Sequence, residues 1–90
     1  VGSLRLRIVT PHQELLDDAV EMVILPGSEG ELGVYPGHIP LVTTLKDGEI
    51  QAGKGERERR FRVAGSWAKI SSEQVIVLAR EAEALDGTRQ

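Results

Sequence analysis

Residues 48–54, Gly-Glu-Ile-Gln-Ala-Gly-Lys, could bind a nucleotide phosphate, because they fit the first seven positions of the pattern G-x-x-x-x-G-K-[ST]. The eighth position should carry a hydroxyl for the magnesium ion of the nucleotide, but it is Gly55. A phosphate loop must also open a helix, so that backbone N–H groups converge on the anion. No helical pattern follows, and the charged residues from Glu56 onward indicate the far strand of a hairpin. The segment therefore does not predict a phosphate site.

The other residues that could do chemistry are few and scattered. His12 and His38 are far apart in the sequence, and neither has a second histidine or a cysteine two to four residues away, so a metal site has little support. Asp17 and Asp18 are adjacent, and neighbouring side chains of a strand point to opposite faces. No serine stands in a nucleophile elbow, and the chain has no cysteine. The sequence predicts no catalytic residue, no metal ligand and no cofactor.

Composition limits the classes of partner. The chain has 90 residues, enough for one domain, and only 3 % are aromatic, so the core must be built from Leu, Ile and Val. The net charge of −3 argues against binding to nucleic acid, which needs an excess of Lys and Arg. The one basic run, around residues 57–62, is interleaved with Glu56 and Glu58. No segment is long and apolar enough to span a bilayer, so membrane association would depend on another chain.

Short apolar runs separated by turn residues predict an all-β fold, a flattened sandwich or barrel of mostly antiparallel strands. In residues 4–10, apolar and basic side chains alternate, as a half-buried strand requires. Asp47-Gly48 predicts a tight hairpin turn. Further strands are expected at 19–25, 32–35, 41–44, 50–52, 61–64, 66–70 and 75–79. From Arg80 on, the composition favours a helix, so we expect a sandwich domain over 1–82 and a short tail, disordered or helical, over 83–90.

Residues 30–42 contain the closest grouping of turn-forming residues and His38. The chain reverses twice there, which requires glycine, and proline stiffens the corners. We expect a rigid, protruding loop that serves as a contact surface, with His38 satisfying the turn, contacting a partner or, with least support, acting in catalysis. The residues expected to shape this loop are Gly30, Gly33, Pro36, Gly37 and Pro40.

The order of these motifs resembles the epsilon subunit of F-type ATP synthase. The resemblance covers about residues 4–82, and its most specific parts read Gly-Glu-Leu-Gly at 30–33, Pro-Gly-His-Ile-Pro-Leu at 36–41 and Thr-Thr-Leu-Lys-Asp-Gly-Glu-Ile at 43–50. The sequence departs from the usual pattern at Tyr35 and at Ser66-Trp67. It also stops before the C-terminal pair of helices that the family usually has, although residues 85–89 resemble the start of that region's ATP-binding motif.

The resemblance implies a non-catalytic rotor subunit in the central stalk that docks the gamma subunit to the c-ring and couples ion flow to ATP synthesis. We expect it at the cytoplasmic face of a bacterial inner membrane, or of the equivalent energy-transducing membrane. It implies that Glu29, Glu31 and His38 face the c-ring. Exposed apolar positions suggest Met22, Trp67 and Ile70 as contacts to gamma. In this family the helical pair inhibits ATP hydrolysis, so we expect this chain alone not to do so. The alternative is a stand-alone sandwich that binds a ligand or peptide.

Overall fold

The computed structural model describes residues 3–53 and 55–85, and it folds them into eight β-strands and one turn of 3₁₀ helix, η1. The predicted fold class, an all-β sandwich of mostly antiparallel strands, is confirmed. The elements are β1 (Leu4–Val9), β2 (Glu14–Val20), β3 (Val23–Gly27), β4 (Gly30–Val34), β5 (Leu41–Leu45), β6 (Gly48–Ala52), η1 (Gly55–Arg57), β7 (Arg59–Ile70) and β8 (Gln74–Leu85).

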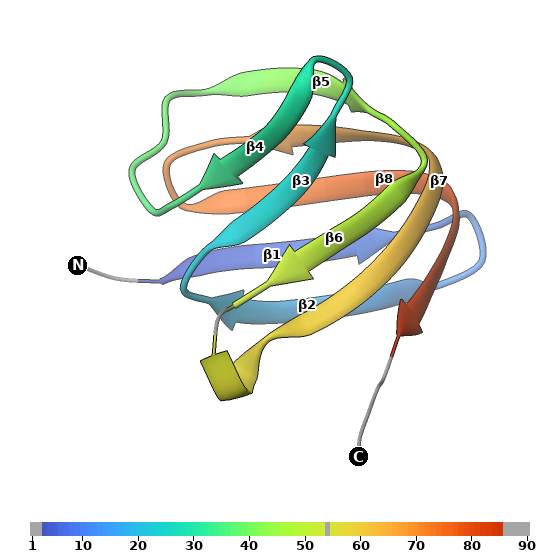
Figure 1. Cartoon of the computed structure of the whole chain (residues 1–90), viewed down its shortest axis with the longest axis horizontal. Helices are drawn as coiled ribbons and strands as arrows, with labels where there is room; N and C mark the ends of the chain where they lie inside the picture. The colour runs from blue at the N-terminus through green and yellow to red at the C-terminus, as the bar shows by residue number, and fades with distance from the viewer. Residues whose placement is uncertain (1–2, 54, 86–90) are drawn as a thin grey trace.

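All eight strands belong to one sheet that folds over on itself. The order is β2-β1-β8-β7-β5-β3-β4, and β6 pairs with both β3 and β7. Every pair is antiparallel except β1 with β8, the first and last strands of the chain. A twisted sheet of this width curls rather than staying flat. Figure 1 shows the result, with β3, β4 and β6 in front of β1 and β8, and β7 reaching into both layers.

Strand β1 shows how the sequence builds the core between the layers. Leu4, Leu6 and Ile8 are completely buried, whereas Arg5 and Arg7 lie on the outer face, as the alternating pattern predicts. The core is aliphatic apart from one phenylalanine. Its other large, fully buried side chains are Phe61, Leu25, Ile50, Ile70, Val23, Val34, Val63, Val75 and Val77.

Strand β7 turns a corner at Gly65, and its inward-facing positions change there. Phe61 and Val63 point into the core before the corner, and Ser66 and Ala68 do so after it. Gly65 has a φ of +61°, a left-handed conformation that adds a bend without ending the strand. The sequence predicts two strands separated by this glycine, but the structure has a single strand of 12 residues. One strand therefore serves both layers.

The chain does not reverse at Asp47-Gly48, so the predicted hairpin is wrong. Strand β5 ends opposite Ser66 of β7, and β6 begins opposite Val63 of the same strand. The chain thus continues along β7 in one direction and bends at the same level as Gly65. There the Asp47 carboxylate accepts the Gly65 backbone N–H at 3.0 Å. The aspartate side chain takes the hydrogen bond that a backbone carbonyl would accept in an unbent pair.

Strand β8 continues to Leu85, beyond Ala79, where the sequence predicts its end. Its second half pairs with the first half of β7. The helix-favouring composition from Arg80 is therefore overruled as far as Leu85, because cross-strand pairing satisfies the backbone groups of this segment. The expected domain boundary at residue 82 falls inside this strand, and residues 86–90 of the expected tail lie outside the described residues.

We predict that Gly65→Ala lowers the free energy of unfolding by about 1–3 kcal/mol, because alanine is strained at positive φ. The new methyl group would also lie 3.1 Å from two atoms of Arg80. Gly33→Ala is the matched control: a methyl group there would meet no atom within 4 Å and its φ is not positive, so a change within about 0.5 kcal/mol is expected. Urea unfolding measures both. Equal effects at the two glycines would contradict the role of the corner.

We predict that Ser66→Ala raises the free energy of unfolding by about 1 kcal/mol. The Ser66 hydroxyl is buried and has no hydrogen-bond partner among the described residues, so its removal relieves a desolvation cost. Ser28→Ala is the opposite case, because the Ser28 hydroxyl donates to the Thr44 carbonyl at 2.9 Å and its loss should destabilise. Thermal and urea unfolding would report the two signs. A loss of stability in Ser66→Ala would contradict the prediction, because it would show that the hydroxyl forms a hydrogen bond in solution.

Candidate functional site

The tight turn between β3 and β4 presents two carboxylates to the solvent. Gly27 pairs with Gly30, so only two residues make the turn, and Gly30 takes a φ of +132°. Ser28 fixes the turn against β5, since both its N–H and its hydroxyl donate to the Thr44 carbonyl. The neighbouring Glu29 and Glu31 are exposed. The sequence thus places two exposed acidic groups at a tight turn.

The loop between β4 and β5, residues 35–40, carries His38. It is held by short backbone hydrogen bonds: the Gly37 N–H donates to the Ser72 carbonyl at 2.7 Å, and the His38 N–H donates to the Tyr35 carbonyl at 3.2 Å. The ring Nδ1 of His38 lies 2.6 Å from the Ile39 carbonyl oxygen, and the residue is half-buried. One ring nitrogen is therefore used within the turn itself. The loop is anchored to the β7–β8 turn rather than free.

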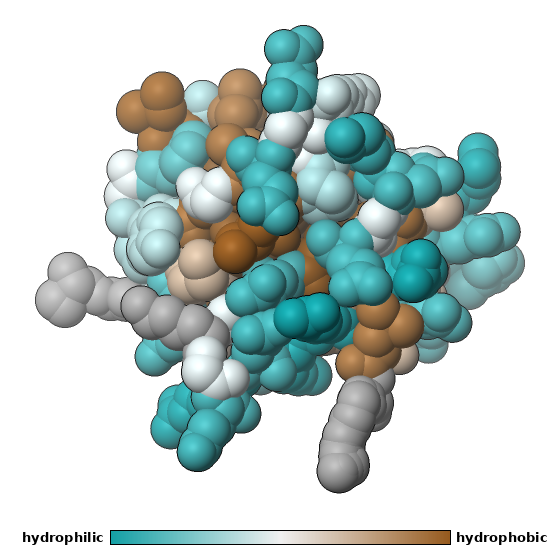
Figure 2. Space-filling view, viewed as in Figure 1, coloured by the Kyte–Doolittle hydropathy of each residue, from teal (hydrophilic) through white to brown (hydrophobic). Residues whose placement is uncertain are grey.

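The same loop and the start of β5 expose most of the large apolar surface. Tyr35 is 54 % exposed, Ile39 74 %, Leu41 39 % and Val42 62 %. Figure 2 shows hydrophobic surface at the upper left, where the β4–β5 loop and the start of β5 lie in Figure 1. We name these four residues the apolar loop patch. Several exposed apolar side chains gathered in one segment of a small domain are typical of a binding surface.

The apolar members of this patch were not predicted from the sequence as site residues, although a signal was present. Ile39 lies between Gly37 and Pro40, in a loop with no regular structure to bury it. Leu41 and Val42 are consecutive at the start of a strand, and consecutive side chains point to opposite faces. At least one of the two must therefore face outward. The predicted acidic residues form the border of the surface rather than its centre.

Strand β4 separates the predicted docking residues into two groups. Glu29 and Glu31 lie at its start and His38 follows its end. Five residues of strand span about 16 Å, so the carboxylates and the imidazole form two parts of one surface and not a single cluster. In Figure 1 the β3–β4 turn lies at the top of the molecule and the β4–β5 loop at its left. Such spacing suits contact with an extended partner surface and does not suit acid–base chemistry, which requires hydrogen-bond reach.

Two of the three expected gamma contacts are buried. Met22 is 6 % exposed and Ile70 is 1 % exposed, so neither side chain offers area to a partner. Ile70 is buried because β7 bends at Gly65, and after this corner its even-numbered positions face the core. Trp67 is 38 % exposed and lies on the outer face. Of these three residues, only Trp67 can take part in a contact.

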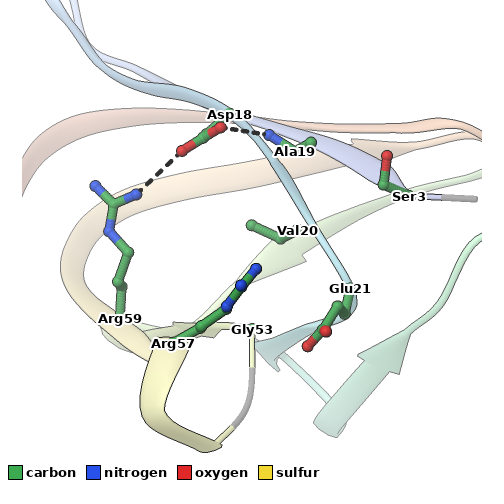
Figure 3. A pocket seen from close by; sticks show the side chains of 8 residues that line it. All are labelled: Ser3, Asp18, Ala19, Val20, Glu21, Gly53, Arg57 and Arg59. Atoms are coloured by element: carbon green, nitrogen blue, oxygen red, sulfur yellow. Dashed lines mark hydrogen bonds and ion pairs between the residues drawn. The ribbon is translucent and has the colours of Figure 1, made fainter.

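A cavity of about 440 Å³ lies between the end of β2, η1 and the start of β7 (Figure 3). The Asp18 carboxylate accepts the Ala19 N–H at 2.8 Å and pairs with Arg59 at 3.3 Å. Glu21 and Arg57 also line the cavity, so among the described residues that line it two acids face two arginines. The cavity has the groups of a surface ion-pair network rather than those of a catalytic centre.

The three arginines at the start of β7, Arg59, Arg60 and Arg62, form intramolecular ion pairs. Arg60 bonds to Glu58 at 2.8 Å, and Arg62 lies 3.5 Å from Glu49. The hydrogen bond and the charge of Glu58 raise the pKa of Arg60 above its ordinary value. Within residues 3–53 and 55–85, no three His, Cys, Asp or Glu side chains gather as metal ligands would, and no helix is long and apolar enough to cross a membrane.

The sequence is similar to known proteins over almost its whole length. A family model described as "ATP synthase, Delta/Epsilon chain, beta-sandwich domain" matches residues 3–85. The ATP synthase epsilon chain of Syntrophobacter fumaroxidans is 41 % identical over 81 residues, which are 90 % of this chain and 60 % of the relative. That of Granulibacter bethesdensis is 45 % identical over 83 residues, 91 % of this chain and 62 % of the relative. The chain thus spans about three fifths of these relatives.

Solved structures agree at the level of the fold. A chain of the Euglena gracilis mitochondrial ATP synthase (OSCP/F1/c-ring) superposes with a TM-score of 0.86 at 22 % identity, covering 99 % of this chain and 57 % of the other. A chain of the Tetrahymena thermophila central stalk and c-ring gives 0.73 at 13 % identity, with 89 % and 65 % covered. The family model and the epsilon-chain relatives show that the chain belongs to the beta-sandwich domain family of the ATP synthase delta and epsilon chains.

Proposed function

We propose that this chain is a non-catalytic part of the central stalk of an F-type ATP synthase, where it connects the gamma subunit to the c-ring and helps to couple ion flow to ATP synthesis. Family membership supports this proposal, as do the epsilon chains among its relatives. The observation that carries it is the apolar loop patch: four of the five large exposed apolar residues of the described chain fall within residues 35–42. Strand β4 joins this segment to the acidic turn.

The apolar loop patch and the acidic turn have the make-up of a protein interface. Interfaces have an apolar centre that excludes water and a polar rim that sets register. Ile39 and Val42, the most exposed of the apolar residues, would supply the centre. Glu29, Glu31 and His38 would form the rim against the polar loops of the ring. The rigid hydrogen bonding of both segments lowers the entropy that binding must overcome.

The body of the sandwich suits the transmission of torque. Strand β7 runs through both layers without interruption and is paired on both sides. Close-packed interiors of this kind resist deformation and pass strain on. The gamma contact would use the outer face that carries Trp67. The chain would lie on the cytoplasmic face of a bacterial inner membrane, held there through the complex.

We predict that Glu31→Ala with His38→Ala, and separately Ile39→Ser, weakens binding to a purified c-ring by about tenfold or more, because each removes part of the rim or the centre. Binding to gamma should be unchanged. All three side chains lie in surface segments, so the fold should survive. Co-elution of the chain with gamma and c-ring of the same organism, followed by titration, measures both contacts.

The matched control is His12→Ala with Glu81→Ala, which removes the same two residue types from exposed positions away from β4. This control should bind the ring like the wild type. If this control weakens ring binding as much as the loop variants do, the loss of binding comes from the change in net charge and not from a lost docking contact. If the wild-type chain joins neither partner, the central-stalk proposal fails.

A further inference from the structure

Residues 28–44, which we name the docking segment, contain every residue proposed for the ring contact. Glu29 and Glu31 lie near its start, and His38 and the apolar loop patch lie nearer its end. Its two ends, Ser28 and Thr44, are 16 residues apart in the sequence and are hydrogen-bonded to one another. The docking surface is therefore carried by one stretch of chain that is closed at its base.

Side chains as well as backbone close the docking segment. The Ser28 hydroxyl donates to the Thr44 carbonyl at 2.9 Å, and the Ser28 N–H donates to the same oxygen at 3.2 Å. The two hydroxyl oxygens are 2.6 Å apart. Because the single hydroxyl hydrogen of Ser28 is used on the carbonyl, the Thr44 hydroxyl donates to Ser28 Oγ. The two side chains thus add two hydrogen bonds to the backbone bond at the closing point.

The strand ladder next to this contact is short. Among the described residues, β3 and β5 share one register pair, Gly27 with Leu45. One further backbone bond joins them, from the Lys46 N–H to the Pro26 carbonyl at 2.8 Å. Short ladders with solvent-exposed hydrogen bonds open at low free-energy cost. The two hydroxyl bonds therefore strengthen the closure at the point where the ladder ends.

The closing contact also connects the acidic turn to the apolar loop patch. Val42 and Thr44 are two positions apart in β5, so their side chains share one face and lie about 7 Å apart. Ser28 is bonded to Thr44 and directly precedes Glu29. This connection is shorter than the path of about 16 Å along β4. The rim and the centre of the surface are thus held together on two sides.

We infer that Ser28 and Thr44 are positioning residues for the c-ring contact, which close the docking segment and hold the acidic turn in a fixed arrangement relative to Ile39 and Val42. The inference rests on the proposed function and names the residues that pre-organise its site. A surface that is ordered before binding avoids the entropy cost of being ordered by the partner. Ser28 and Thr44 act through the acidic turn and not through a ring contact of their own.

The first measurement follows the closing contact itself and needs no partner. Amide hydrogen exchange at residue 28 reports the bond to the Thr44 carbonyl. Exchange at Gly37, whose N–H donates to the Ser72 carbonyl, reports the other anchor of the segment. Ser28→Ala should lower the protection at residue 28 about fivefold and leave that at Gly37 within about twofold. Ser28→Thr keeps a hydroxyl at this position and should restore the protection.

The second measurement is titration of each variant with a purified c-ring of the same organism. Ser28→Ala should weaken binding about fivefold, because the hydroxyl bonds are lost while the backbone bonds remain. Ser28→Thr should bind within about twofold of the wild type. Glu31→Ala should weaken binding less in the Ser28→Ala chain than in the wild-type chain, since an acidic turn that is no longer held contributes less to the contact.

Thr10→Ala is the matched control. The Thr10 hydroxyl donates to the Gln13 carbonyl at 3.3 Å and accepts the N–H groups of His12 and Gln13 at 3.2 Å, so it fixes the loop between β1 and β2, outside the docking segment. Its loss should lower the free energy of unfolding, as Ser28→Ala does, but leave ring binding within about twofold. Urea unfolding verifies that every variant is folded under the binding conditions.

The outcomes separate the inference from the proposed function. Loss of protection and of ring affinity in Ser28→Ala, with recovery in Ser28→Thr, supports the inference. Unchanged protection or unchanged ring affinity in Ser28→Ala overturns it while the proposed function stands. Equal weakening by Thr10→Ala, or an equal cost of Glu31→Ala in both chains, also overturns it, because Ser28 would then affect stability and not position. If the wild-type chain does not bind the ring, the proposed function fails and the inference fails with it.

Discussion

The hydrogen bond from the Gly65 N–H to the Asp47 carboxylate fixes the point on which the rest of the domain depends. Three neighbouring segments, from β5 to β6, within β7 and within β8, all change their inward-facing positions at this level. A shift of one residue moves every side chain of a strand to the other face. Because the three strands shift together, their register is kept and the core continues around the corner. Without a common corner, one sheet would not enclose a core.

The corner also gives one strand two different outer faces. Before it, β7 presents Arg60 and Arg62, which pair with the acids of β6 and its own first turn. After it, β7 presents Trp67 and Lys69 beside the apolar side chains of β8 and β1. The first face is internally neutralised and needs no partner. The second has exposed apolar area at Trp67, so the two layers have separate surface chemistry although they share a strand.

Much of the fold follows from local pattern, and the exceptions have a common physical cause. The alternation in β1 and the turns at Gly30 and Gly37 depend on neighbours in sequence, and the sequence predicts them. The continuity of β7, the path of the chain past Asp47 and the length of β8 depend on pairing between distant strands.

The candidate site, like the fold, was predictable only where it depends on residues close in sequence. The acidic turn and the His38 loop follow from glycine and proline spacing together with the family resemblance. The burial of Ile70 beside an exposed Trp67 does not, because the phase of the strand changes at Gly65. The pairing of Leu78 with both Val9 and Trp67 joins three strands from the two ends of the chain, and no local signal encodes it.

The parallel pairing of β1 with β8 has a consequence for biosynthesis. The first strand of the domain to leave the ribosome finds one of its two neighbours only among the last residues of the domain. Closing so long a loop is entropically slow. Until then Leu4, Leu6 and Ile8 have only β2 beside them. The nascent chain therefore exposes an apolar strand that is paired on one edge only for most of its translation. Its folding without aggregation depends on how soon the C-terminal strand is synthesised.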